Sequence, residues 1–116
     1  MDKSEQSVVL LVTRNGMGEA EQALQHKLFQ VYLKMLDGSN IIPNVICFYT
    51  DGVKLVVEGS PLLEELKSLE AKGVRLIICS TCLNYFGLLE QVRVGIVGGM
   101  PDIIEAQWGA DKVISI

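Results

Sequence analysis

Short runs of consecutive apolar residues, rich in β-branched side chains, alternate along the chain with segments of helical periodicity. The runs predict strands that are buried on both faces, over Val8–Val12, Val45–Tyr49, Val74–Ile78, Val94–Val97 and Val113–Ile116. A helical segment separates each strand from the next, as parallel strands require. The pattern predicts an α/β fold, a three-layer α/β/α sandwich with a mostly parallel five-stranded sheet.

The first predicted helix, from Glu19 to Leu36, carries two apolar stripes side by side. One stripe has the regular spacing of a single helix face and consists of Ala20, Leu24, Leu28, Val31 and Met35. The other consists of Phe29, Tyr32, Leu33 and Leu36. We assign the first stripe to the sheet and the second to a subunit partner, because a lone domain of 116 residues would not expose so much apolar surface. A homo-oligomer is therefore expected.

Capping residues indicate the other helices. Ser60 as N-cap and Pro61 at the first helical position predict a helix through Leu69 that Gly73 ends. A short helix to about Phe86 follows the third strand, and Pro101 begins a last helix. Residues 54–57 fit either an extended piece or an extra helical turn, and the sequence leaves both open.

Composition limits the kind of protein. The net charge is −4 and basic residues are scattered, which argues against a nucleic-acid or anionic-membrane partner. No apolar run approaches the roughly 18 residues that a membrane span needs. The polar segment 1–6 leads directly into a strand, so no secretory signal is expected. Three cysteines in such a chain indicate the reducing cytoplasm rather than a disulfide framework. We expect a single domain over 1–116.

The chemistry of the chain is concentrated in Cys79-Ser80-Thr81-Cys82, at the junction of the third strand and a helix. Free N–H groups and the positive end of the helix dipole lower the pKa of a thiol at such a position. Cys82 follows about one turn later, close enough to form a disulfide with Cys79 or to receive what it carries. The pair predicts thiol chemistry, whereas two small residues packing a strand end are the structural alternative.

Other candidate groups are weaker. Ligands of parallel sheets bind beyond the carboxyl ends of the strands, where Thr50-Asp51-Gly52 and Gly98-Gly99 emerge together with the loop containing Asn15, Gly16 and Gly18. This loop lacks the third glycine of a dinucleotide site, and no P-loop is present. We interpret it as a glycine turn that shapes the floor of the thiol pocket. His26 is expected on a solvated helix face and Cys47 in the core.

No cofactor is expected. No metal is expected either, because zinc needs about four ligands and one CxxC supplies only two, so a metal site would have to be completed across a symmetry axis. A thioredoxin-type redox site is a rival interpretation, since paired thiols at a helix start are common to both. Against it, this motif follows the third strand rather than an early one.

Three segments resemble the DsrE/DsrF-like sulfurtransferase family, and in particular the C-terminal domain of YedF-type selenium metabolism proteins. They are 52–60, the cysteine block from Cys79 to Leu88, and 110–114. The resemblance implies one DsrE-like domain in which Cys79 holds a persulfide, because Cys79 and Gly87 match the family's cysteine and glycine in spacing. It also implies a trimer or hexamer. Tyr85 and Phe86 depart from the family, whose relay proteins have an arginine just before that glycine.

Two functions follow. In the first, the chain is a sulfur or selenium carrier or sulfurtransferase. Cys79 accepts sulfur from a donor such as a TusA-like carrier or a cysteine desulfurase, Cys82 resolves the persulfide, and N–H groups around Ser80 and Thr81 stabilise the anion. In the second, it is a non-catalytic oligomeric binding or redox-sensing module. The first requires that Cys79 be reachable from solvent, whereas the second tolerates two buried thiols. Whether the chain is an enzyme is left open.

Overall fold

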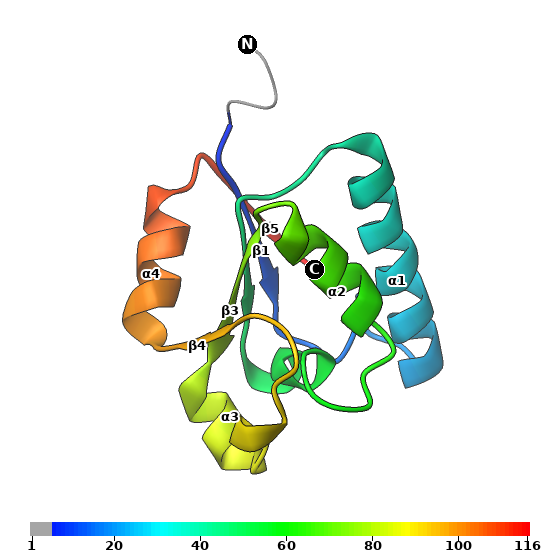
Figure 1. Cartoon of the computed structure of the whole chain (residues 1–116), viewed down its shortest axis with the longest axis vertical. Coiled ribbons are helices and arrows are strands. Elements are labelled where there is room, and N and C mark those ends of the chain that lie inside the picture. The colour runs from blue at the N-terminus through cyan, green and yellow to red at the C-terminus, as the bar shows by residue number, and fades with distance from the viewer. Residues whose placement is uncertain (1–5) are drawn as a thin grey trace.

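A five-stranded sheet runs through the centre of the computed structural model, which describes residues 6–116 (Figure 1). Its strands are β1 (Val8–Val12), β2 (Val45–Phe48), β3 (Arg75–Cys79), β4 (Ile96–Gly98) and β5 (Lys112–Ser115). They lie in the order β4-β3-β2-β1-β5, and every neighbouring pair is parallel. The predicted α/β fold is confirmed, with a sheet that is parallel throughout.

The helices form a layer on each face of this sheet. Helices α1 (Gln22–Ser39) and α2 (Leu63–Ala71) cover one face, and α4 (Met100–Gly109) lies on the other (Figure 1). The strand order explains this division. The chain steps in one direction from β1 to β4 and then returns across the sheet to β5, so a right-handed crossover places α4 on the opposite face.

Three short helices occupy the connections, namely α3 (Ser80–Phe86) and the 3₁₀ helices η2 (Thr50–Leu55) and η3 (Leu89–Gln91). The undecided segment 54–57 is thus the end of η2 followed by Val57, which pairs with Val92 in an isolated antiparallel bridge. The predicted start of the second helix is wrong: Pro61 lies in a turn, Leu62 is the N-cap of α2, and Ser60 Oγ instead accepts the N–H of Leu62 at 3.2 Å.

The assignment of the two apolar stripes of α1 is wrong. Phe29 and Leu33 are fully buried, whereas Leu24, Leu28, Val31 and Met35 are 47–64% exposed. Both stripes have the helical period, so the sequence shows that they are two separate faces of the helix. It does not show which face is turned toward the sheet. Packing on the sheet decides this, and it selects the stripe with the aromatic side chain. We call Leu24, Leu28, Val31 and Met35 the outer stripe.

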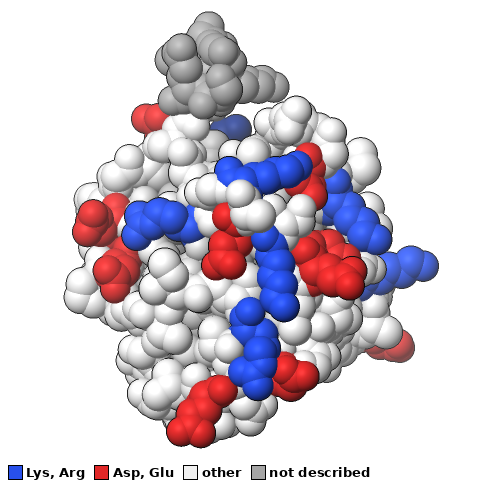
Figure 2. Space-filling view, in the orientation of Figure 1, with Lys and Arg blue, Asp and Glu red and all other residues white. Residues whose placement is uncertain are grey.

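A second apolar surface lies on the α4 side of the molecule. It consists of Ile96, Met100, Ile104 and Trp108, which are 47–84% exposed. Charged side chains are distributed differently: on the face in Figure 2, Lys and Arg are interspersed with Asp and Glu. That face shows no basic patch of the kind that binds nucleic acid.

Candidate functional site

The candidate site is the junction between β3 and α3. Cys79 is the last residue of β3 and the N-cap of α3, with an extended backbone, and Ser80 is the first helical residue. Gly87 ends α3 in the left-handed conformation, at a φ of 69°, which is why a glycine suits this position. The predicted strand–helix junction at the CxxC motif is confirmed.

The two thiols of the motif are in different environments. Cys79 is 2% exposed and belongs to the main hydrophobic core. Cys82 is half-buried and lines a pocket of about 290 Å³ together with Thr50, Asp51, Thr81, Tyr85 and Phe86. Both cysteines are free thiols. Cys79, which the carrier hypothesis requires to be reachable, is therefore the shielded member of the pair.

A backbone donor is aimed at the sulfur of Cys82. The N–H of Thr50 donates to Cys82 Sγ at 3.1 Å, from the end of the neighbouring strand. Thr50 has a φ of 50°, an uncommon conformation for a β-branched residue. Its Oγ1 lies 2.6 Å from the carbonyl oxygen of Thr13 and 2.7 Å from that of Tyr49. These contacts hold the strained residue in place, with its N–H directed at the thiol.

The pKa of Cys82 is raised above its ordinary value. Burial is the largest cause, and the adjacent Cys79 thiol adds to it, whereas the Thr50 N–H acts in the opposite direction. Cys82 is therefore mainly a neutral thiol near pH 7, and only a small fraction of it is thiolate.

Lys54 contacts two residues of this pocket, Phe86 and Asp51. Its Nζ lies 4.5 Å from the centroid of the Phe86 ring and 2.8 Å from Asp51 Oδ1. Asp51 and Lys54 also line a second, polar depression of about 470 Å³ with Arg14, Asn15 and Glu19. The thiol pocket thus adjoins a surface of mixed charge.

The glycine loop has a different role from the one predicted. Gly16 packs against Gln25 of α1 so closely that a Cβ there would overlap it. The amide of Gln25 donates to the carbonyl oxygen of Gly18 at 2.7 Å. Neither glycine lines the Cys82 pocket, so the prediction that they form its floor is corrected: they fix the loop on α1.

Asn15 and His26 belong to the same loop–helix contact. Asn15 Oδ1 lies 3.1 Å from Nε2 of His26, which is half-buried rather than fully solvated. Cys47 is fully buried in β2, as predicted, and burial raises its pKa to about 11.

Sequence reasoning placed Thr50 and Asp51 at this edge of the sheet without assigning them to the thiol pocket, and it missed the pocket residues Tyr85 and Phe86. The signal for Thr50 and Asp51 was position, because residues 50–52 follow the strand next to β3. Of the predicted supporting residues, Thr81 lines the pocket, Ser80 begins α3 and Gly87 ends it.

Within residues 6–116, no three His, Cys, Asp or Glu side chains are grouped in a way that could hold a metal ion. Over the same residues, no helix combines the length and apolarity needed to cross a bilayer.

The model of the DsrE/DsrF-like family matches residues 6–116. This match covers nearly the whole chain, and the chain therefore belongs to the DsrE/DsrF-like family. No significant match was found among curated proteins.

Solved structures with the same fold include the YchN protein from E. coli, with a TM-score of 0.70 and 18% identity, covering 96% of this chain and 99% of that one. A protein of unknown function from Methanobacterium thermoautotrophicum, MTH1491, has a TM-score of 0.70 at 18% identity, covering 97% and 100%. A third, BT1422 from Bacteroides thetaiotaomicron, has a TM-score of 0.65 at 17% identity, covering 98% and 97%. At these identities the likeness shows the fold alone.

Proposed function

We propose that the chain is a sulfur or selenium carrier that uses Cys79 and Cys82 as a dithiol relay. The observation that carries this proposal is the asymmetry of the two adjacent free thiols. Cys82 lines a pocket and receives a backbone N–H, whereas Cys79 lies behind it in the core. A thiol that lines a pocket can contact a donor, and a shielded thiol can keep its persulfide away from the thiols of other molecules.

Loading occurs in two exchanges. The Cys82 thiolate attacks the terminal sulfur of a donor persulfide R–S–SH, the donor S–S bond breaks, and R–S⁻ leaves with Cys82–S–SH formed. The Cys79 thiolate then attacks the terminal sulfur of that persulfide. This step forms Cys79–S–SH and returns Cys82 to the thiolate. Neither exchange is a net oxidation or reduction, and no cofactor takes part.

Release uses Cys82 as the resolving thiol. Its thiolate attacks Sγ of Cys79, a Cys79–Cys82 disulfide forms, and HS⁻ leaves. The two thiols supply the two electrons that reduce the sulfane sulfur to sulfide. A cellular dithiol must then reduce the disulfide before the next cycle. The Thr50 N–H, at 3.1 Å from Cys82 Sγ, stabilises negative charge on that sulfur in each of these steps.

The proposal has three further parts. The chain acts in the cytoplasm, its donor is a protein such as a TusA-like carrier or a cysteine desulfurase, and it works as a homo-oligomer, a trimer or a hexamer. The mixed-charge surface beside the Cys82 pocket offers a docking site for such a donor. The resemblance of the 79–88 block to YedF-type proteins supports selenium as an alternative cargo.

Two observations are compatible with the non-catalytic alternative: Cys79 is 2% exposed, and the pKa of Cys82 is raised, as a slow redox sensor would require. The two functions differ in what the thiols retain after they meet a persulfide. When one of the two cysteines is replaced by serine, a carrier gains sulfur at the other cysteine, whereas a sensor gains none.

The test is mass spectrometry of the chain after incubation with a cysteine desulfurase and cysteine. In Cys79→Ser, one sulfur atom should accumulate on Cys82, because the second exchange is blocked. In Cys82→Ser, loading should slow by roughly tenfold or more, because the entry thiol is missing. The unmodified chain should release sulfide and form the Cys79–Cys82 disulfide. Cys47→Ala is the matched control and should behave as the parent. Equal sulfur uptake by the parent and a Cys79→Ser/Cys82→Ser double variant would support the binding-module function.

A further inference from the structure

A second cavity lies on the α1 side of the sheet, among elements that the thiol site does not use. It has a volume of about 160 Å³. Val8, Leu10 and Ile114 form its floor, and Tyr32 and Leu36 of α1 form one wall. The segment Ile41–Pro43 forms another. β5 is an edge strand beyond β1, so α1 leaves this corner of the sheet open.

The walls of this cavity are fixed by the fold. Asn40 ends α1 in the left-handed conformation, and the N–H of Ile41 donates to the carbonyl oxygen of Leu36, which turns the chain back over the sheet. The Tyr32 ring packs on the buried Phe29 ring, with 6.2 Å between centroids. The cavity is therefore built from packed elements rather than from a loose loop.

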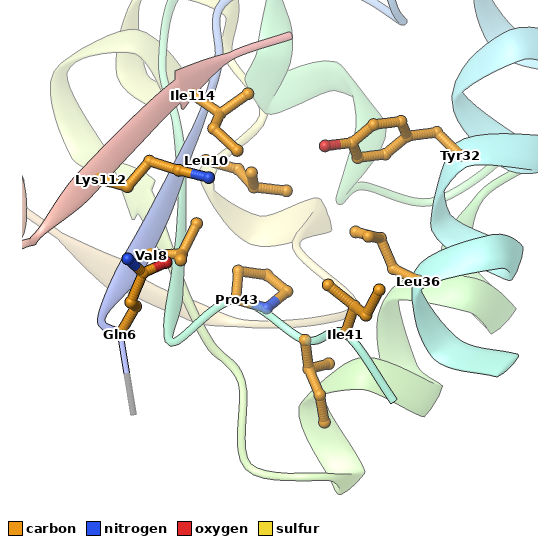
Figure 3. Close-up of a pocket in the computed structure, with 10 residues that line it drawn as sticks. Gln6, Val8, Leu10, Tyr32, Leu36, Ile41, Pro43, Lys112 and Ile114 are labelled. Atoms are coloured by element: carbon orange, nitrogen blue, oxygen red, sulfur yellow. The ribbon is translucent and has the colours of Figure 1, made fainter. Parts of the chain in front are cut away.

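Two polar groups for which the described residues supply no partner face this space. Figure 3 shows the Tyr32 hydroxyl and the Lys112 ammonium pointing from different walls toward the space over Leu10. Within residues 6–116, the Tyr32 hydroxyl makes no hydrogen bond and Lys112 makes no ion pair. Burial raises the pKa of Tyr32, so its hydroxyl keeps its proton and remains a donor well above pH 7.

We propose that this cavity binds a small aromatic carboxylic acid. A volume of about 160 Å³ is close to that of an engineered apolar cavity, roughly 150 Å³, that holds a benzene ring. The aliphatic walls accept the ring. The Lys112 ammonium and the Tyr32 hydroxyl are both donors, and a carboxylate is the group that accepts from both at once. The site is separate from Cys79 and Cys82, and it does not depend on the proposed sulfur chemistry.

Phenylacetate serves as the probe, titrated into the full chain while NMR signals of the cavity residues are followed. Shifts at Leu36 and Ile114 that saturate are expected. 2-Phenylethanol, which has the same ring without the charge, should bind roughly tenfold more weakly. A failure of phenylacetate to shift these signals at millimolar concentration, or equal binding of the alcohol, overturns the proposal.

Variants separate the two donors. Lys112→Gln should weaken phenylacetate binding by roughly tenfold, and Tyr32→Phe by several-fold, since the latter keeps the ring and loses only the hydroxyl. Lys67→Gln, an exposed lysine of α2, is the charge-matched control and should bind as the parent. If a second copy of the chain fills the cavity instead, phenylacetate binding will fall as protein concentration rises, and this result also contradicts the proposal.

Discussion

The two stripes of α1 have similar apolar side chains and opposite environments, and the two thiols of the CxxC motif repeat the contrast. Phe29 and Leu33 are fully buried, whereas the outer stripe beside them is about half exposed. Cys79 is in the core, whereas Cys82, one turn later, lines a pocket. In both cases the chemical type of a residue did not decide its environment. The rotation of the element that carries it relative to the sheet did.

The stripes should differ most in stability. Phe29→Ala removes a fully buried ring and should lower the free energy of unfolding by about 3–5 kcal/mol. Leu28→Ala, one residue earlier and 47% exposed, should cost less than about 1 kcal/mol. Urea unfolding at one protein concentration measures both. Equal losses in the two variants would contradict the packing of α1 described here.

A buried thiol should make stability depend on pH. Burial raises the pKa of Cys47 from 9.0 to about 11, so the folded state favours the protonated thiol. The resulting stabilisation is complete below pH 9.0 and is lost as the pH rises to about 11. The stability lost over this range is about 2–3 kcal/mol.

In Cys47→Ala this part of the alkaline loss should disappear. Urea unfolding measured at several pH values would show it as a flatter slope than that of the parent. The slopes are compared rather than the absolute stabilities, because the smaller side chain also leaves a cavity. Parallel slopes in parent and variant would show that Cys47 does not titrate in this range.

Alkylation should distinguish the two thiols of the motif. Limiting iodoacetamide should label Cys82 at least roughly tenfold faster than Cys79, which is 2% exposed. Because the pKa of Cys82 is raised, its labelling rate should keep increasing at pH values above the ordinary thiol pKa. Peptide mapping by mass spectrometry measures both rates. Faster labelling of Cys79 would restore it as the entry thiol.

Substitutions in the outer stripe should have the smallest effect on the stability of the single chain and the largest effect on its oligomeric state. Leu28→Gln with Met35→Gln should change the stability of the monomer by no more than about 0.5 kcal/mol per site, because both positions are half exposed or more. If the outer stripe is the subunit interface, sedimentation should show the parent as an oligomer and this variant as a species of 12.7 kDa. Ile104→Gln with Trp108→Gln is the matched control, and dissociation by that pair alone would move the interface to α4.

Much of the site was predictable from local pattern. The apolar run before Cys79 predicted the strand, and a short helix to about Phe86 was predicted after it; the structure confirms both. Thr50 was predictable as a residue at the carboxyl end of a strand, but its contact with Cys82 was not. It reaches Cys82 only because β2 lies next to β3, and the order of parallel strands depends on contacts between distant segments. The glycine loop was wrongly predicted to form the floor of the thiol pocket for a related reason. Its partner Gln25 lies on a helix face for which the sequence predicted no contact.

The sequence by itself predicted five strands in a mostly parallel sheet, helices between them and the position of the thiol pair at a strand–helix junction. These features depend on the periods of side chains along the backbone, on capping residues and on chain connectivity, all of which are local. Only the tertiary structure decided which stripe of α1 meets the sheet, which thiol faces the pocket and which backbone N–H stabilises it. Each of these depends on which neighbouring element a side chain or backbone group contacts. Those contacts follow from the packing of the elements and from the strand order, which no local period encodes.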